Sequence, residues 1–178
     1  ISAAGTVAFV MECVEHGLLD VDRDLGGLDL RFGNGEAVLE AIPLIADRTG
    51  AGELLALGSR RIAERLGGDA LDFAMQVKGL ELAMHEPRGK VGVGLGYATN
   101  EAGADHLVGF HDPIFVNPES VPFRGAMALG GIEPANVFTL GETKVRNWYT
   151  SERWNSAEKV LGLCFFGPAP RSFIQVCR

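Results

Sequence analysis

Residues 5–17, GTVAFVMECVEHG, give the clearest indication of the fold. Their apolar side chains Val7, Val10 and Val14 recur at three- and four-residue spacing, which is the period of one buried face of an α-helix. Gly17 follows, and glycine favours a helix C-terminus because it adopts the left-handed conformation at little cost. This stretch therefore predicts an amphipathic helix that stops at Gly17.

Two further segments carry the same helical period. Residues 34–50, NGEAVLEAIPLIADRTG, start with Asn34 as the predicted N-cap, and the residues predicted to be buried are Val38, Leu39, Ile42 and Ile45. Residues 52–68, GELLALGSRRIAERLGG, predict a second amphipathic helix that follows it. Strand-like alternation is scarce in the chain. The predicted fold is all-α, with many helices packed orthogonally and a region of loops rich in glycine and proline.

Composition and charge exclude several classes of protein. The chain has 178 residues, 47% of them hydrophobic and 22% charged, as in an ordinary globular domain or two small ones. Its net charge of −7 and lack of basic clusters argue against nucleic acid as the main partner. No apolar run reaches the roughly 20 residues of a membrane span, so no membrane partner is expected.

The three cysteines, Cys13, Cys164 and Cys177, are sparse and form no C-x-x-C pair. An odd, scattered set does not build a disulfide framework, which predicts a reducing compartment and a cytoplasmic location. The same spacing argues against a metal or iron–sulfur site made from this stretch alone.

Residues 85–106, HEPRGKVGVGLGYATNEAGADH, are unusually rich in glycine. Spaced glycines can present backbone N–H groups to a phosphate, but Gly92, Gly94 and Gly96 lack the full spacing of a dinucleotide fingerprint. The alternative is close packing, since a glycine lets a neighbour approach the backbone, and the spacing by itself favours this interpretation. The segment is predicted to be a glycine-dominated loop, followed by a short helix in residues 101–110.

The last part of the chain combines loops with one long helix. Residues 112–141 contain four prolines and are predicted to be loop-rich. A final helix is predicted within residues 143–166, with Val145, Trp148 and Val160 among its apolar positions.

The character of the chain changes near residues 77–85. We therefore predict a helical domain over residues 1–80 and a helical, loop-rich domain over residues 81–178. The sequence opens on an apolar stretch and closes with the largely apolar run FIQVCR, which suggests that it is a segment of a longer protein.

Four stretches, in order, resemble the tungsten-containing aldehyde ferredoxin oxidoreductase family. Residues 80–106 resemble its segment L-E-L-x-x-x-D/E-P-R-G-x-x-G-x-G-L-x-Y-A-T-x-x-x-G-x-x-H. Residues 1–17 resemble its I-S-x-G-x-T helix, residues 30–68 its R-F/W-G-N helix pair, and residues 160–166 its late G-L-C segment. The resemblance implies the end of the second and the start of the third of three domains, both mostly helical.

The resemblance also implies a redox site. In that family tungsten is held by two pterins beside a 4Fe–4S cluster, and aldehydes are oxidised to carboxylates with electrons passing to ferredoxin. His106 would be the catalytic residue near the metal and substrate, a role that suits the near-neutral pKa of imidazole. Cys164 would be the fourth cluster ligand, and Gly162 and Leu163 would contact a pterin through their backbone. Molybdenum in place of tungsten is left open.

Two features depart from the family pattern. Lys159 stands where the family has an aspartate that accepts hydrogen bonds from pterin N–H groups, and an ammonium group cannot accept them. Val108 stands where some members have a lysine. His85 and His111 have no counterpart in the resemblance and are predicted to be structural. Arg88 is left open between a phosphate and a neighbouring carboxylate.

These departures keep two other interpretations open. One is the catalytic subunit of an aromatic acyl-CoA reductase of the benzoyl-CoA type, and the other is a helical structural or binding module without a cofactor. The expected partners are ferredoxin or another electron-transfer subunit and a small aldehyde or acyl substrate, with a homodimer among the assemblies considered. Since the other three cluster cysteines would lie upstream, this stretch alone is expected to be inactive and free of cofactor.

Overall fold

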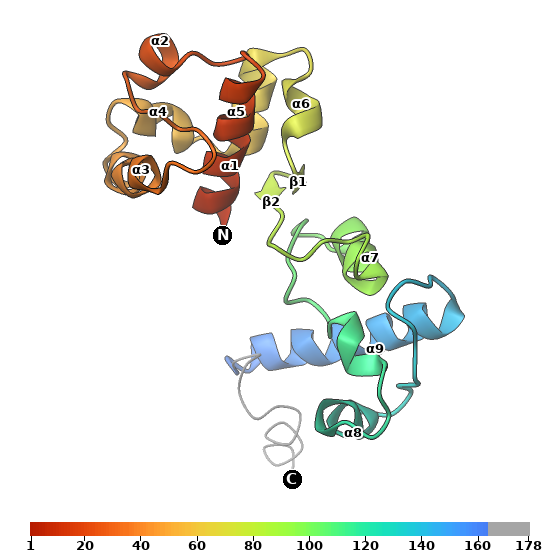
Figure 1. Cartoon of the computed structure of the whole chain (residues 1–178). Helices are drawn as coiled ribbons and strands as arrows, with labels where there is room; N and C mark the ends of the chain where they lie inside the picture. Colours follow the sequence, from red (N-terminus) through yellow and green to blue (C-terminus); the bar gives the residue numbers. More distant parts are fainter. Residues whose placement is uncertain (164–178) are drawn as a thin grey trace. The chain divides into compact units, whose positions relative to one another are not determined.

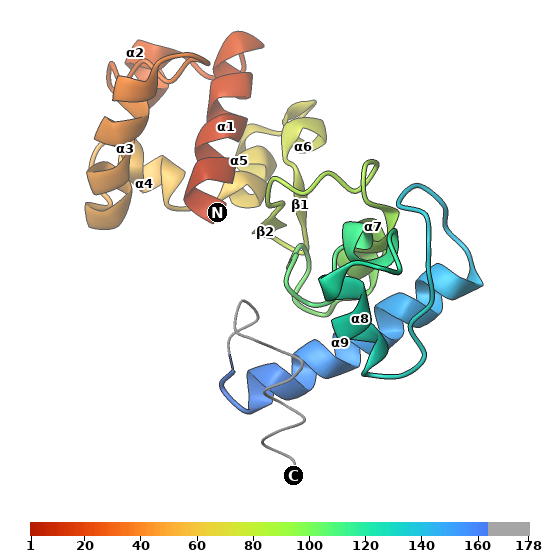
Figure 2. The same cartoon turned by 60° about the horizontal axis from the view of Figure 1, so that its bottom comes forward.

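A computed structural model describes residues 1–163 of the chain (Figures 1 and 2). The chain divides into two compact units. The first unit comprises Ile1–Ala83 and Ala102–Ala104, and the second comprises Met84–Glu101 and the residues from Asp105 onward. The prediction of an all-α fold is confirmed. Within residues 1–163 the strands are limited to one antiparallel pair, β1 (Gln76–Val77) and β2 (Leu80–Glu81).

The first unit is organised around α1 (Ser2–Glu15), which packs against α3, α4, α5, α6 and β2. Val7, Val10 and Met11 are buried on its inner face, as the spacing predicts. The helix ends at Glu15, and Gly17 follows with a φ of +70°, so the predicted stop is confirmed.

Helices α2 (Val21–Leu25) and α3 (Gly35–Asp47) follow, and each begins at a side-chain cap. The Asn34 side chain accepts a hydrogen bond from the N–H of Ala37 at 3.2 Å, which confirms the predicted cap. Half of the predicted buried face of α3 is confirmed, since Val38 and Ile45 are partly buried and pack against the core. The other half is wrong, because Leu39 is 68% exposed and Ile42 is 55% exposed. The fully buried residues are Ala37 and Ala41, whose small side chains allow close contact.

The single helix predicted over residues 52–68 is two helices, α4 (Ala51–Leu55) and α5 (Ser59–Leu66). The break falls at Gly58, which has a φ of +83°. The new N-terminus at Ser59 is capped from a distance, since the buried Glu81 carboxylate accepts from its N–H at 2.9 Å and its hydroxyl at 3.1 Å. A cap supplied 22 residues away leaves no local signal.

The rest of the first unit comprises α6 (Ala70–Phe73) and the β1–β2 hairpin. Its turn residues Lys78 and Gly79 both have positive φ, which matches the twist of a two-residue hairpin. The unit has one continuous apolar core that draws on every helix. Its most deeply buried apolar side chains are Val10, Cys13, Leu25, Leu30, Ala41, Leu55, Ile62, Ala63 and Ala70.

The second unit contains α7 (Val91–Thr99), the 3₁₀ helix η1 (Asp112–Phe115), α8 (Val121–Met127) and α9 (Glu142–Val160). Two predictions are wrong here. The glycine-rich stretch predicted as a loop forms α7, and residues 101–110, predicted to carry a short helix, form turns. The domain division predicted at residues 80 and 81 remains a sequence prediction.

The final helix is present as α9, and the predicted apolar position Trp148 is buried, but the rest of the predicted apolar face is not. Val145 and Val160 are exposed, the latter to 87%. The buried positions are mostly polar and recur at helical spacing: Lys144, Asn147, Trp148, Ser151, Asn155 and Glu158. The apolar cluster of this unit is small and consists of Phe115, Phe123, Ala126 and Ile132 with a few partly buried neighbours.

Candidate functional site

The glycine-rich helix α7 is held by tertiary contacts, since three glycines in nine residues oppose helix formation. A Cβ atom on Gly96 would lie 2.1 Å from a ring carbon of Trp148 in α9. A Cβ on Gly92 would lie 2.8 Å from the Asp112 carboxylate. The glycines therefore admit an indole ring and a carboxylate against the helix backbone, as the close-packing interpretation predicts.

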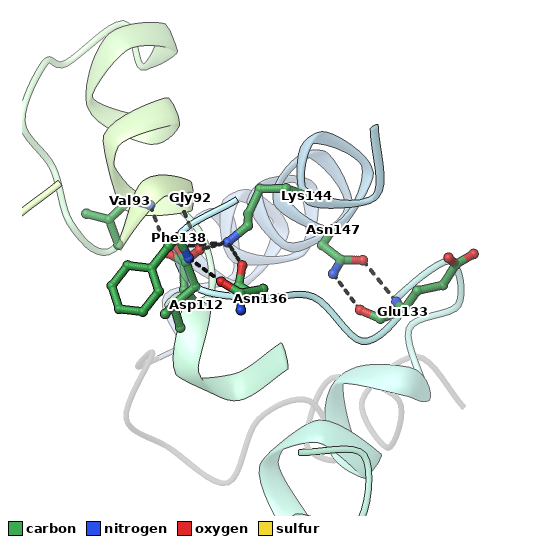
Figure 3. A network of polar contacts seen from close by, with 9 residues as sticks. Gly92, Val93, Asp112, Glu133, Asn136, Phe138, Lys144 and Asn147 are labelled. Atoms are coloured by element: carbon green, nitrogen blue, oxygen red, sulfur yellow. Dashed lines mark hydrogen bonds and ion pairs between the residues drawn. The ribbon is translucent and has the colours of Figure 1, made fainter. Parts of the chain in front are cut away.

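Asp112 occupies the N-terminus of α7 (Figure 3). Its carboxylate accepts from the N–H of Gly92 at 3.0 Å and from the N–H of Val93 at 3.2 Å. These are the free amide groups of the first turn, where the helix dipole also favours a negative charge. Because a carboxylate of the chain fills this position, the phosphate-binding interpretation of the glycine run is wrong for the structure described.

Lys144 of α9 neutralises that buried carboxylate (Figure 3). Its ammonium group forms an ion pair with Asp112 and donates to the carbonyl oxygens of Asn136 and Val137. Asp112 is 0% exposed and Lys144 is 2% exposed. The pair joins α7, η1, α9 and the loop before α9 at one point.

Further along α9, other polar side chains hold the turn of residues 105–112. Ser151 accepts from the N–H of Phe110 at 3.1 Å, and Asn155 donates to the carbonyl of Leu107 at 3.2 Å. Lys159 donates to the carboxylate of Asp105 at 2.8 Å. Together with the Lys144–Asp112 pair, these contacts run in order along the helix. We call Lys144, Ser151, Asn155 and Lys159 the α9 polar stripe.

The turn held by this stripe carries His106, which lies in a cluster of three imidazoles. The ring centroid of His106 is 4.8 Å from that of His85 and 6.1 Å from that of His111. The rings of His85 and His111 are 4.4 Å apart and nearly perpendicular. Lys90, the N-cap residue of α7, brings its ammonium nitrogen to 3.1 Å from Nδ1 of His85 and 3.3 Å from Nδ1 of His111. His106 therefore lies in an ordered cluster of side chains, to which the two other histidines belong.

The environment of the histidine cluster disfavours imidazolium. Burial is the main cause that lowers the pKa of all three rings below the ordinary value of 6.5. The neighbouring imidazole of His111 and the ammonium group of Lys90 lower the pKa of His85 further. For His106 the second cause that lowers the pKa is the ring of His85, while the Asp105 carboxylate opposes the shift. Neutral imidazole is thereby favoured near pH 7, as a proton acceptor requires.

Two charged residues from the sequence analysis acquire partners. The guanidinium of Arg88 donates two hydrogen bonds to the Glu86 carboxylate, at 2.8 and 2.9 Å, so its partner in the structure is the neighbouring carboxylate. For Asp105, burial is the largest single influence and would raise the pKa, but the hydrogen bonds from Lys159 and from the N–H of Leu107, with the positive charge of Lys159, together bring the pKa below its usual value. Lys159, which cannot serve as an acceptor, is thus committed to the residue that precedes His106.

The residues expected to contact a pterin lie at the end of α9. Gly162 has a φ of +70° and is exposed, and no atom of the described residues lies within 4 Å of the position that a Cβ would occupy. The N–H of Gly162 donates to the backbone carbonyl of Lys159, and the N–H of Leu163 donates to that of Glu158. Both amides therefore take part in the C-terminal hydrogen bonds of α9. An open glycine surface fits a flat ring system, whereas Lys159 lacks the acceptor expected there. Cys164, the expected cluster ligand, lies outside the described residues.

The described part of the chain does not form a metal centre by itself. Within residues 1–163 no group of three His, Cys, Asp or Glu side chains has the arrangement needed to hold a metal ion. No histidine lines either of two surface hollows of about 420 Å³, one lined by Arg60, Arg61 and Lys78 among others and the other by Thr150 and Arg153 among others. The helices of the described part also include none that is long and apolar enough to cross a membrane.

Sequence reasoning selected His106 but missed the residues around it. It left His85 and His111 as structural and did not single out Asp112 and Lys144. The members of the ion pair are 32 positions apart and the two histidines are 26 apart, so no local motif joins them. One signal was available: polar residues recur at helical spacing along residues 144–158, where an amphipathic helix would bury apolar ones.

Comparison with known proteins places the chain among oxidoreductases. A family model described as "Aldehyde ferredoxin oxidoreductase, domains 2 & 3" matches residues 1–176. The chain belongs to the aldehyde ferredoxin oxidoreductase family.

Individual relatives agree with this assignment. The chain is 43% identical over 167 residues to the tungsten-containing aldehyde ferredoxin oxidoreductase of Pyrococcus furiosus, and 36% identical over 169 residues to that of Pyrococcus horikoshii. Each match covers 93% of this chain and 25% of the relative, so the chain spans about a quarter of their length. It is also 30% identical over 112 residues, 60% of this chain and 18% of the relative, to the WOR-like subunit of an aliphatic sulfonate oxidoreductase from Pyrococcus furiosus.

Proposed function

We propose that the protein containing this chain is a tungsten-dependent oxidoreductase that oxidises aldehydes to carboxylates and passes electrons through a 4Fe–4S cluster to ferredoxin or another electron-transfer subunit. The observation that carries the proposal is the family match over residues 1–176, in which His106 occupies a partly buried, neutral imidazole cluster. Domains 2 and 3 of the family supply part of the site, and the remainder is expected from polypeptide outside this chain.

The reaction RCHO + H₂O → RCOOH + 2 H⁺ + 2 e⁻ releases two protons and two electrons. When bound, the tungsten–pterin centre supplies the two-electron redox chemistry, and Gly162, Leu163 and Cys164 are the residues of this chain that would hold the cofactors. His106 accepts a proton, because its ring is kept neutral by burial and by the neighbouring ring of His85. Asp105 and Lys159 fix the turn that carries it.

The α9 polar stripe contributes the precision that proton transfer requires. A general base must lie within hydrogen-bonding distance of the proton that it removes, so a shift of about 1 Å in the turn would reduce the rate. Three backbone or carboxylate groups of this turn are fixed by Ser151, Asn155 and Lys159. These contacts restrict movement of the turn relative to α9.

The test is to express the full-length protein, measure its tungsten, molybdenum and iron content, and assay aldehydes with a viologen as electron acceptor. We expect tungsten and iron in the purified protein and aldehyde oxidation. Replacement of His106 by Asn should lower kcat by about 100-fold or more without loss of metal. His16→Asn is the matched control, since His16 lies in the first unit, stacked on Phe73.

The alternatives correspond to other outcomes of the same test. Metal-loaded protein that reduces benzoyl-CoA and does not oxidise aldehydes would identify an aromatic acyl-CoA reductase. Activity on an aliphatic sulfonate in place of aldehydes would indicate the substrate class named for the more distant relative. Protein without tungsten, molybdenum or iron would identify a cofactor-free helical module and would contradict the proposal.

A further inference from the structure

The hydrogen bonds of Lys90 determine the protonation state of two histidines. An ammonium group only donates, so Nδ1 of His85 and Nδ1 of His111 must both be acceptors. Each ring is then neutral, with its proton on Nε2. For His111 this assignment agrees with a separate contact, because its Nε2 lies 2.8 Å from the carbonyl oxygen of His106 and must donate to it.

These contacts form a directed chain from Lys90 to His106. Lys90 donates to Nδ1 of His111, and Nε2 of the same ring donates to the carbonyl of His106. The second branch runs from Lys90 to His85, whose ring lies against that of His106. The backbone and the side chain of His106 are therefore both positioned through a ring that Lys90 orients.

The charges around the cluster single out Lys90. Glu86 is paired with Arg88, Asp105 with Lys159, and Asp112 with Lys144. Among the described residues no carboxylate forms an ion pair with Lys90, and its hydrogen bonds go to imidazoles. Its positive charge therefore acts directly on the rings and opposes the addition of a proton to them.

We propose that Lys90 is a positioning residue for His106, which it holds through the neutral, Nε2-protonated rings of His85 and His111. This inference rests on the proposed catalytic role of His106. It assigns a function to two histidines that the sequence left as structural. It also gives the residue at the start of the glycine-rich helix a role in proton transfer.

The direction of the effect follows from the charge. The pKa of His85 and that of His111 both lie below the ordinary value, with burial as the main cause and Lys90 as a contributing one. Removal of the ammonium group should therefore raise both pKa values. It should also free the rings to adopt the other tautomer, in which His111 no longer donates to His106.

The test compares Lys90→Met with Arg88→Met in the full-length holoenzyme. Arg88→Met removes a cation two positions away whose partner is Glu86, and it leaves the histidine contacts intact. Two properties are measured: the titration of ¹³C-labelled histidine by NMR, and the pH profile of kcat/KM for aldehyde oxidation. Lys90→Arg, which keeps the charge and the donors, serves as the conservative variant.

We expect Lys90→Met to move the histidine titrations and the acid limb of the pH profile to higher pH, with kcat about tenfold lower and KM little changed. Arg88→Met should behave as wild type, and Lys90→Arg should recover most of kcat. If Lys90→Met does not load its cofactor, Lys90→Gln replaces it, since glutamine keeps an N–H donor without the charge.

Unchanged histidine titrations in Lys90→Met would overturn the inference, as would shifted titrations with an unchanged pH profile. Failure of the proposed function is distinguishable. If the proposed reaction is wrong, the wild-type protein itself will not oxidise aldehydes, and if the catalytic role of His106 is wrong, His106→Asn will keep wild-type activity; neither outcome depends on the histidine titrations of the Lys90 variants.

Discussion

The two units of the chain bury different kinds of side chain. The first unit encloses one continuous apolar core, to which α1, α3, α4, α5 and α6 all contribute. The second unit has a small apolar cluster, and its longest helix buries polar side chains, among them Lys144, Ser151 and Asn155 of the α9 polar stripe. Apolar burial is not directional and tolerates small shifts, whereas hydrogen bonds and ion pairs fix atoms at defined positions. The histidine cluster lies in the unit that is built in the second way.

This contrast predicts that the second unit is the more sensitive to single changes of charge or volume at its centre. Hydrogen–deuterium exchange in the full-length protein can measure the difference, because exchange reports the opening free energy of each helix separately. The expected loss of protection is largest when the buried ion pair is broken. It is smaller when the glycine–indole contact or the apolar core is changed, and smallest when the histidines are titrated.

The largest effect is expected from Lys144→Met. The substitution leaves the fully buried Asp112 carboxylate without its counter-charge, and loss of one partner of a buried pair costs about 3–5 kcal/mol. Protection of α7 and α9 should fall by the corresponding factor. Arg146→Met, in the same helix, breaks an exposed ion pair with Glu142 and should cost less than about 1 kcal/mol. Equal losses in the two variants would contradict the central role given to the buried pair.

A smaller loss is expected from Gly96→Ala. Alanine favours a helix by about 1 kcal/mol over glycine, but its Cβ would lie 2.1 Å from the Trp148 ring. Because the indole is buried between Gly96 and Gly109 and cannot move aside, the clash should prevail, at a net cost of about 2 kcal/mol. Gly35→Ala at the start of α3 meets no atom of residues 1–163 within 4 Å and should be neutral or slightly stabilising. A stabilising Gly96→Ala would show that the glycines are not required for packing.

The apolar core of the first unit should tolerate a loss of volume better. Ile62 is fully buried in α5, and Ile62→Val removes one methylene group at a cost of about 1 kcal/mol. Ile42→Val, on the exposed face of α3, should have almost no effect on the same helices. A cost for Ile62→Val as large as that for Lys144→Met would remove the difference between the two units.

The smallest effect is expected from pH, and in the second unit only. The folded pKa values of His85, His106 and His111 lie below the ordinary 6.5, so the unfolded chain binds protons first as the pH falls. Stability from these groups is therefore complete above pH 6.5 and is lost as the pH drops toward the folded pKa values. Partial exposure of the rings limits the size of the loss.

Exchange of α7 measured at pH 7.5 and pH 5.5, corrected for the intrinsic rate, should reveal the lower protection at the acid pH. His111→Gln should reduce this difference, and His16→Asn should leave it unchanged. Protection that rises as the pH falls would contradict the assignment of neutral imidazoles.

The sequence was sufficient where the structure depends on neighbouring residues. The spacing of Val7, Val10 and Val14 predicted α1 and its buried face, and Gly17 and Asn34 marked helix ends through their own backbone and side-chain chemistry. Prediction from the sequence failed where a helix end depends on a residue far away in the chain. Glu81 caps α5 and Asp112 caps α7, and neither cap leaves a signal in the helix that it stabilises.

The candidate site divides in the same way. His106 was found through its position in the motif of residues 80–106, whereas His85 and His111 were set aside because nothing local distinguishes them. Apolar periodicity also misled the prediction of the last helix, where Val145 and Val160 are exposed and Ser151 and Asn155 are buried. A hydrophobicity pattern cannot identify a buried face that consists mostly of polar side chains.

The sequence by itself determined the helical class of the protein, several helix ends and the family. Helical period, helix caps and motifs all depend on residues that are close together in the sequence. Only the tertiary structure decided that a glycine-rich stretch is a helix and that three histidines and a lysine share one site. It also decided which polar side chains are buried. Several of the contacts behind these properties join groups 20 to 54 residues apart, such as Gly92 with Asp112 and Asp105 with Lys159. The free energy of such contacts arises only after folding has brought the partners together and removed them from water.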